Sequence, residues 1–247
     1  HDDNPTRRPG YVTWLLIGVN VVVFLLSPLA THFVGSTPLR QESQTQADFD
    51  RYAAVPDELV QNRQEKSTVA YVDGSCVPLT PPPFHKQPVL SVLTAMFLHG
   101  SWLHLLGNML FLFVFGNNVE DRLGRLRYLA FYLVCGYAAT YGFALFQHSS
   151  TQPLVGASGA IAGVLGAYFV LFPRARVLSL LTFLFFLPIR LPAWLVLGSW
   201  FVLQYLSLRA NAAGSGSGVA YLAHVIGFVL GAVFCWRLRG TARTYAR

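Results

Sequence analysis

Long apolar runs alternate with shorter polar segments along most of this chain. About 20 apolar residues are enough to cross the hydrocarbon core of a bilayer as a helix. Six such segments fall between residues 11 and 238, namely Tyr11–Val34, Val89–Asn117, Tyr128–Phe146, Gly156–Phe172, Ala193–Leu208 and Val219–Trp236. The pattern predicts an all-α membrane protein, with six transmembrane helices packed as one bundle.

Polar stretches set the limits of this predicted membrane domain. Residues 1–10 and 239–247 are expected to be tails, and residues 35–88 form the one long polar stretch. We interpret that stretch as a solvated loop or small cap outside the membrane. Within it, part of Ala47–Glu65 fits a short amphipathic helix, and Pro81–Pro83 should be extended.

The first run lacks a small-residue cleavage site, so we interpret it as a retained anchor rather than a cleaved signal peptide. The stretch from Val177 to Pro192 is interrupted by Pro188, Arg190 and Pro192, and we expect it to lie along the cytoplasmic interface before the fifth span.

Composition and charge support a multi-pass membrane protein and exclude a nucleic-acid partner. Hydrophobic residues make up 53% of the chain and charged residues 12%, whereas a soluble domain carries about 25% charged residues. The net charge is +7, but the basic residues occur in short clusters between apolar runs, as in cytoplasmic loops that face anionic lipid. Both termini are therefore expected in the cytoplasm. A bacterial plasma (inner) membrane fits these clusters and the absence of a visible targeting signal.

Ionisable groups within the predicted spans are scarce, which excludes several mechanisms. After the long loop the only acidic residues are Glu120 and Asp121, at a predicted cytoplasmic helix end. A proton-relay pump and a paired-aspartate protease both need carboxylates within the membrane. No H-E-x-x-H motif is present, so no metal is expected. Cys135 and Cys235 lie in apolar runs, and no structural disulfide is predicted.

Ser158 and His224 are the candidates for covalent chemistry. Ser158 opens the fourth apolar run, where unpaired N–H groups of a helix N-terminus can stabilise an oxyanion. Glycines four residues apart, Gly159 with Gly163 and Gly227 with Gly231, make faces that allow close helix contact. Such faces would bring the serine and the histidine together near the outer side. The alternative is that both are packing residues, and spacing alone does not separate the two interpretations.

His104 and Asn108 are four residues apart and project from one helical face. Both can donate hydrogen bonds to an oxyanion. The alternative is an interhelical polar contact worth about 0.6 kcal/mol. His99, five residues before His104, does not share its face well.

These motifs together resemble the rhomboid family of intramembrane serine proteases. The resemblance covers Val89–Trp236 and rests on four matching stretches: Phe97–Ser101 leading to His104–Met109, Gly116–Gly124, Gly156–Gly159, and Ala223-His224 with Gly227 and Gly231. It implies the six-helix rhomboid fold, with Ser158 as nucleophile and His224 as general base. His104, Asn108 and the backbone N–H of Ser158 would form the oxyanion hole.

The same resemblance implies how substrates would bind. The fifth span would be a lateral gate for a transmembrane substrate, with Trp194, Trp200 and Phe201 as lining residues and Gly156 allowing close approach. No cofactor would be needed. Two departures from the family pattern concern substrate preference and rate: the long loop lacks a Trp-Arg pair, and Ala162 stands where some members carry an aromatic residue that packs on the histidine.

The favoured function is hydrolysis of a peptide bond within or beside a transmembrane segment of a membrane protein, near its outer face. Two alternatives from other classes stay open. One is a catalytically silent relative that binds and escorts membrane proteins, although this chain keeps both the serine and the histidine. The other is a small transporter, which the lack of intramembrane carboxylates and of inverted repeats disfavours.

Overall fold

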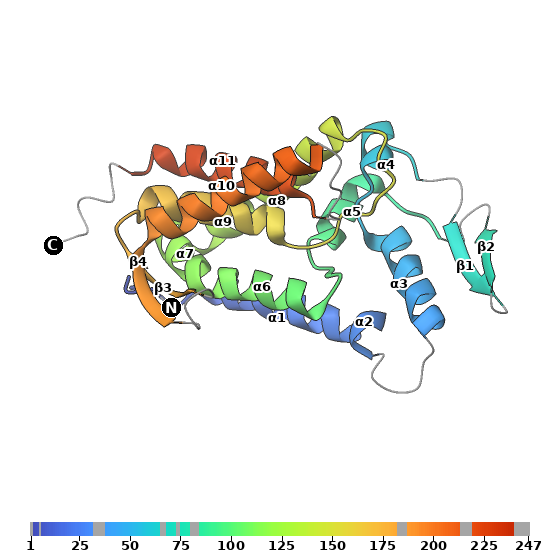
Figure 1. Ribbon diagram of the computed structural model, residues 1–247, viewed down its shortest axis with the longest axis horizontal. Coiled ribbons are helices and arrows are strands. Elements are labelled where there is room, and N and C mark those ends of the chain that lie inside the picture. Colours follow the sequence, from blue (N-terminus) through green and yellow to red (C-terminus); the bar gives the residue numbers. More distant parts are fainter. Residues whose placement is uncertain are drawn as a thin grey trace. The chain divides into compact units, whose positions relative to one another are not determined.

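The computed structural model is mostly helical and describes residues 2–4, 6–31, 38–64, 68–72, 75–79, 84–181, 187–212 and 219–239 (Figure 1). It consists of two compact units. Unit 1 contains residues 1–15, 110–139 and 158–247, and unit 2 contains residues 16–109 and 140–157. Helices α1 (Tyr11–Leu26), α6 (Trp102–Phe111) and α8 (Arg125–Phe146) contribute residues to both. The predicted helical class is confirmed, and two β-hairpins that it did not include are present.

Unit 1 holds the helices that carry the predicted serine and histidine. Its further elements are η1 (Leu112–Gly116), α7 (Asn117–Leu123), α9 (Ser158–Leu171), β3 (Arg176–Leu181), β4 (Leu187–Pro192), α10 (Ala193–Ala212) and α11 (Tyr221–Trp236). Helix α9 is almost entirely buried and packs against both α10 and α11 (Figure 1).

Glycines allow α9 and α11 to approach with their backbones in contact. A Cβ atom added to Gly227 would lie 2.2 Å from the carbonyl oxygen of Gly159, and one added to Gly231 would lie 1.9 Å from that of Gly163. Any side chain at these positions would push the helices apart. The predicted packing of the two glycine faces is therefore present in the structure.

The stretch predicted to lie along the interface is an antiparallel hairpin. Strands β3 and β4 pair from Arg176 with Pro192 to Leu181 with Leu187. Proline lacks an N–H donor, so Pro188 and Pro192 interrupt a helix but are tolerated in an edge strand. This explains why the stretch does not extend the helix that follows. The position of the hairpin relative to a membrane stays a prediction.

Glu120 is buried within α7, near the helix end that the sequence predicted. Its carboxylate accepts hydrogen bonds from the backbone N–H groups of Val12 and Thr13 at 3.0 and 2.7 Å, and from the Thr13 hydroxyl at 2.8 Å. These N–H groups belong to the first turn of α1, where a helix has unpaired donors and a positive dipole end. Glu120 therefore anchors the start of α1.

Unit 2 contains the polar stretch of the chain and the helix that carries His104 and Asn108. Its further elements are α2 (Pro28–Thr31), α3 (Pro38–Tyr52), α4 (Pro56–Gln61), β1 (Thr68–Val72), β2 (Ser75–Leu79) and α5 (Pro88–Ala95). Helix α5 is separate from α6, so the second predicted span begins too early at Val89. The predicted amphipathic helix corresponds to the end of α3 and to α4. The Pro81–Pro83 run lies outside the described residues, as does most of the predicted C-terminal tail, from residue 240 on.

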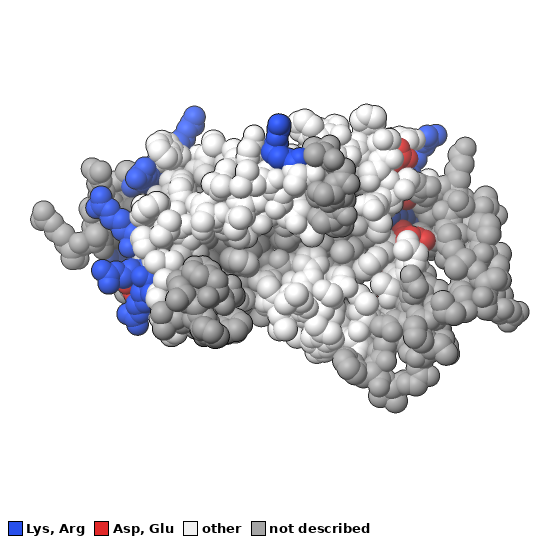
Figure 2. Space-filling model, in the orientation of Figure 1, with Lys and Arg blue, Asp and Glu red and all other residues white. Residues whose placement is uncertain are grey.

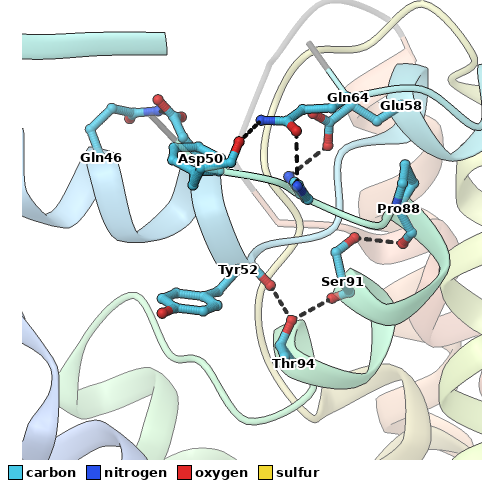
Figure 3. A network of polar contacts seen from close by, with 10 residues as sticks. Gln46, Asp50, Tyr52, Glu58, Gln64, Pro88, Ser91 and Thr94 are labelled. Atoms are coloured by element: carbon cyan, nitrogen blue, oxygen red, sulfur yellow. Dashed lines mark hydrogen bonds and ion pairs between the residues drawn. The ribbon is translucent and has the colours of Figure 1, made fainter. Parts of the chain in front are cut away.

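A polar network ties the long stretch together and joins it to α5 (Figure 3). Glu58 and Lys86 form a buried ion pair with 2.6 Å between Oε2 and Nζ. The Thr94 hydroxyl donates to the carbonyl oxygen of Tyr52 at 2.6 Å. Gln64 donates to the carbonyl of Phe84 and accepts from the N–H of Lys86. We call this assembly of residues 38–64 and 84–95 the cap.

The cap is also bonded to the loop that leads to the predicted serine. Ala54 and Leu154 exchange two backbone hydrogen bonds of 3.1 and 2.7 Å, and the N–H of Asp57 donates to the carbonyl of Ser150. The N–H of Gly156 donates to the carbonyl of Ala95 at 2.8 Å. The long stretch therefore helps to position the loop before residue 158.

Large apolar side chains lie on the outside of both units. In unit 1, Leu126, Val134 and Val233 are 84%, 66% and 64% exposed. Basic side chains gather near the end of unit 1 that carries α7 and the β3–β4 hairpin (Figure 2). The described surface next to these basic side chains carries no acidic or basic residues over a wide area (Figure 2). Among the described residues, two helical stretches have the length and hydropathy to cross a bilayer, Trp102–Leu123 and Arg125–Phe146. Helices α1, α9 and α11 are apolar but shorter.

Candidate active site

Ser158 is the first residue of α9, and its hydroxyl is hydrogen-bonded to His224 of α11. The distance from Ser158 Oγ to His224 Nε2 is 2.8 Å. The serine and histidine are 66 residues apart in sequence, and the glycine contacts between α9 and α11 bring their backbones close enough for this bond. The predicted encounter of the two side chains is thus observed.

The second nitrogen of the His224 ring is bonded to a residue that the sequence analysis did not single out. Nδ1 lies 2.7 Å from Oε1 of Gln204, on α10. A polar side chain within an apolar helix is a signal that could have identified Gln204, since such groups are costly in a membrane unless they have a partner.

Aromatic rings surround the imidazole. The ring of Trp200 on α10 lies 6.1 Å from the His224 ring between centroids, at 32°, and the Tyr221 ring lies 6.4 Å away, at 90°. Ala162, one turn after the serine, carries no ring, so the aromatic neighbours of His224 found here come from α10 and α11.

The residues predicted to line a substrate gate fall into two groups. Trp200 and Phe201 pack against Phe228 of α11, with centroid distances of 6.0 and 4.7 Å. Trp194 lies in the first turn of α10 and is 52% exposed. The structure thus places Trp194 on the surface and the other two rings at the contact between α10 and α11.

Within unit 2, Gly156 is in contact with His104 and close to Asn108. Its backbone φ is +113°, and a Cβ at this position would lie 2.7 Å from Cε1 and Nε2 of His104 and 3.6 Å from Nδ2 of Asn108. Only glycine allows both the left-handed backbone and this approach. The predicted oxyanion hole would combine these two side chains with the N–H of Ser158 from unit 1, and it stays a prediction.

His99 contacts both His104 and Asn108, although its spacing had suggested that it does not share a helical face with His104. It lies in the break between α5 and α6, so helical periodicity does not apply to it. Its Nε2 is 2.9 Å from Nδ2 of Asn108, and its ring is 5.1 Å from that of His104. An amide nitrogen carries two N–H groups, so Asn108 retains a second donor.

Residues 86–241 match the family model of the Rhomboid domain. This region is more than half of the chain. The chain belongs to the rhomboid family. The resemblance inferred from the motifs is confirmed, and the protein is a rhomboid-family membrane protein.

The chain is also similar in sequence to several named rhomboid proteins. The chain is 32% identical over 155 residues to "Rhomboid protein 1, mitochondrial" of Saccharomyces cerevisiae, covering 60% of this chain and 41% of that protein. It is 35% identical over 106 residues to "RHOMBOID-like protein 6, mitochondrial" of Arabidopsis thaliana, covering 40% and 34%. It is 33% identical over 96 residues to "Presenilin-associated rhomboid-like protein A, mitochondrial" of Danio rerio, covering 38% and 25%.

The matched regions cover less than half the length of each of these relatives. The rhomboid domain of this chain nevertheless includes every predicted site residue, from His104 to His224.

Proposed function

We propose that this rhomboid protein is an intramembrane serine endopeptidase, with Ser158 as nucleophile and His224 as general base. The observation that carries the proposal is the 2.8 Å hydrogen bond between Ser158 Oγ and His224 Nε2. A hydroxyl is a weak nucleophile, and a base within hydrogen-bond reach is what activates it. A packing role for both residues would not require this pairing.

The reaction proceeds in two steps. Ser158 Oγ attacks the scissile carbonyl carbon while its proton passes to His224 Nε2, and His224 then protonates the leaving amine as the C–N bond breaks. The acyl-enzyme ester remains. Water attacks this ester, gives a proton to His224, and releases the carboxylic acid product as Ser158 regains its proton.

Both tetrahedral intermediates carry an oxyanion that needs donors. We propose His104, Asn108 and the N–H of Ser158 for this role. The proximity of Gly156 to His104 and Asn108 supports it, because the chain reaches Ser158 only two residues later. Donors fixed in advance and sheltered from water stabilise such a charge strongly. The reaction uses no cofactor and no metal.

The proposed setting is a six-span membrane domain with both termini in the cytoplasm and the Ser158 loop toward the outer side. The substrate is a transmembrane segment of another membrane protein, which reaches the site past α10, with Gly156, Trp194, Trp200 and Phe201 near its path. The distribution of arginines supports the orientation. We propose a bacterial plasma membrane on the same basis, while the three relatives compared above carry mitochondrial names.

The direct test uses purified protein in proteoliposomes with a model single-span substrate whose segment contains small, helix-weak residues near one face. The parent should cleave it, and Ser158→Ala should lower the rate at least about 10³-fold, because the nucleophile is lost. Equal cleavage by Ser158→Ala would refute the proposal. Binding of the substrate without cleavage by the parent would instead support an escort function.

A further inference from the structure

Gln204 is a polar residue on an apolar helix, and its side chain is hydrogen-bonded to the imidazole of His224. A primary amide in an apolar environment is costly unless it is hydrogen-bonded. Here the amide oxygen Oε1 lies 2.7 Å from Nδ1 of His224, and the side chain is half-buried. We propose that Gln204 is the positioning residue that completes the Ser158–His224 pair as an uncharged third member. The inference rests on the proposed function.

The bond to Gln204 determines which nitrogen of His224 carries the proton. An amide oxygen can only accept, so Nδ1 must donate and hold the hydrogen. In a neutral ring Nε2 is then unprotonated and can accept the Ser158 proton across the 2.8 Å bond. Without Gln204 the ring can adopt the opposite tautomer, whose Nε2–H cannot act as a base.

Gln204 also stabilises the charge that forms during the reaction. When His224 takes the serine proton, its Nδ1–H becomes a charged donor, and hydrogen bonds from charged donors are shorter and stronger than neutral ones. A carboxylate would do the same, but it would have to be desolvated in the resting enzyme. A neutral amide avoids that cost.

Trp200, one turn before Gln204 on α10, also contacts the His224 ring. Trp200 lies four residues before Gln204, hence on the same helical face, and its ring packs on that of His224. One face of α10 therefore supplies both a hydrogen bond and an aromatic contact. Together these fix the direction of Nδ1 and the plane of the imidazole.

The first test compares three variants in the proteoliposome assay. Gln204→Leu removes the acceptor at similar size, Gln204→Glu keeps an acceptor oxygen, and Tyr205→Leu changes the adjacent residue, which is 48% exposed. We expect Gln204→Leu to lower kcat about 10- to 100-fold, as expected for a hydrogen bond to a charged group, with KM nearly unchanged. Gln204→Glu should recover most of kcat, and Tyr205→Leu should match the parent. Parental kcat in Gln204→Leu would overturn the inference.

The second test needs no variant of Gln204. In parent protein labelled with ¹⁵N-histidine, the His224 signals, assigned by their loss in His224→Ala, should show a protonated Nδ1 and an unprotonated Nε2. The opposite tautomer would overturn the inference whatever the kinetics show. Ser158→Ala, assayed alongside, distinguishes failure of the proposed protease function from failure of the role proposed for Gln204. Full activity in Ser158→Ala refutes the protease itself, whereas loss there with full activity in Gln204→Leu refutes only the role of Gln204.

Discussion

Gly156 does not react in the proposed chemistry, but its backbone conformation and its contact with His104 both require glycine. Its φ of +113° is poorly tolerated by other residues, and a Cβ would overlap the His104 ring. We predict that Gly156→Ala destabilises the protein by about 1–3 kcal/mol. We also expect it to lower kcat, because His104 must move. Melting temperature and cleavage rate measure the two effects.

The matched control for this substitution is Gly18→Ala, in the middle of α1. Apart from the chain neighbours of Gly18 and the surrounding backbone of α1, no atom lies within 4 Å of the added Cβ, and the backbone is helical, so alanine should stabilise this helix slightly. If both variants behave like the parent, the contact between Gly156 and His104 has no functional role.

Some residues of the candidate site could be predicted from the sequence, and others could not. Glycine spacing on two helices predicted that Ser158 and His224 lie close together, but it did not separate a catalytic pair from two packing residues; only the family resemblance implied their roles. Gln204 could have been noticed as a polar residue in an apolar helix, but its contact with His224 could not be predicted, since nothing along the chain specifies which face of α10 meets α11. His99 was misjudged because helical spacing was applied to a residue that lies before the helix begins.

At the scale of elements, the contact between α9 and α11 should control the reaction. Gly231→Ala would place a Cβ 1.9 Å from the carbonyl oxygen of Gly163. Overpacking of this kind costs about 1–3 kcal/mol, and separation of the helices should lengthen the Ser158–His224 bond. We predict a lower melting temperature together with slower labelling of Ser158 by a fluorophosphonate.

Gly198→Ala on α10 is the control for Gly231→Ala, because the nearest atom to its added Cβ lies 3.7 Å away. It should leave both the melting temperature and the labelling rate close to those of the parent. A parental labelling rate in Gly231→Ala would show that the active pair tolerates a wider spacing of the two helices.

The cap depends on a buried ion pair. Lys86→Met would remove the ammonium group that pairs with the buried Glu58 carboxylate, and loss of one member of such a pair costs about 3–5 kcal/mol. The double variant Glu58→Gln/Lys86→Met should recover most of this loss because no charge remains buried. Thermal unfolding of the three proteins in detergent measures the difference. Equal stability of the single and double variants would contradict the prediction.

Elements outside the apolar runs were the hardest to predict. The polar stretch was expected to be a loop or a small cap, and helices α3 and α4 with the β1–β2 hairpin lie within it. The β3–β4 hairpin was missed because its apolar residues are equally compatible with a helix, and the prolines only indicate an interruption. Short apolar segments do not distinguish a helix from a strand by pattern alone.

At the scale of the whole molecule, the open prediction is topology. The six-span arrangement puts Arg127 on the cytoplasmic side and Gln152 on the outer side. In intact cells that express a Cys76→Ser background, a membrane-impermeant maleimide should label Gln152→Cys. It should label Arg127→Cys only after lysis. Labelling of Arg127→Cys in intact cells would reverse the proposed orientation.

Activation of Ser158 by His224 can be measured without a known substrate. Purified protein is treated with a fluorophosphonate, and the modified residue is located by mass spectrometry of its peptides. We predict an adduct on Ser158 in the parent and its loss in His224→Ala at an unchanged melting temperature. No adduct in the parent, or equal labelling in His224→Ala, would show that His224 does not activate Ser158 as a nucleophile.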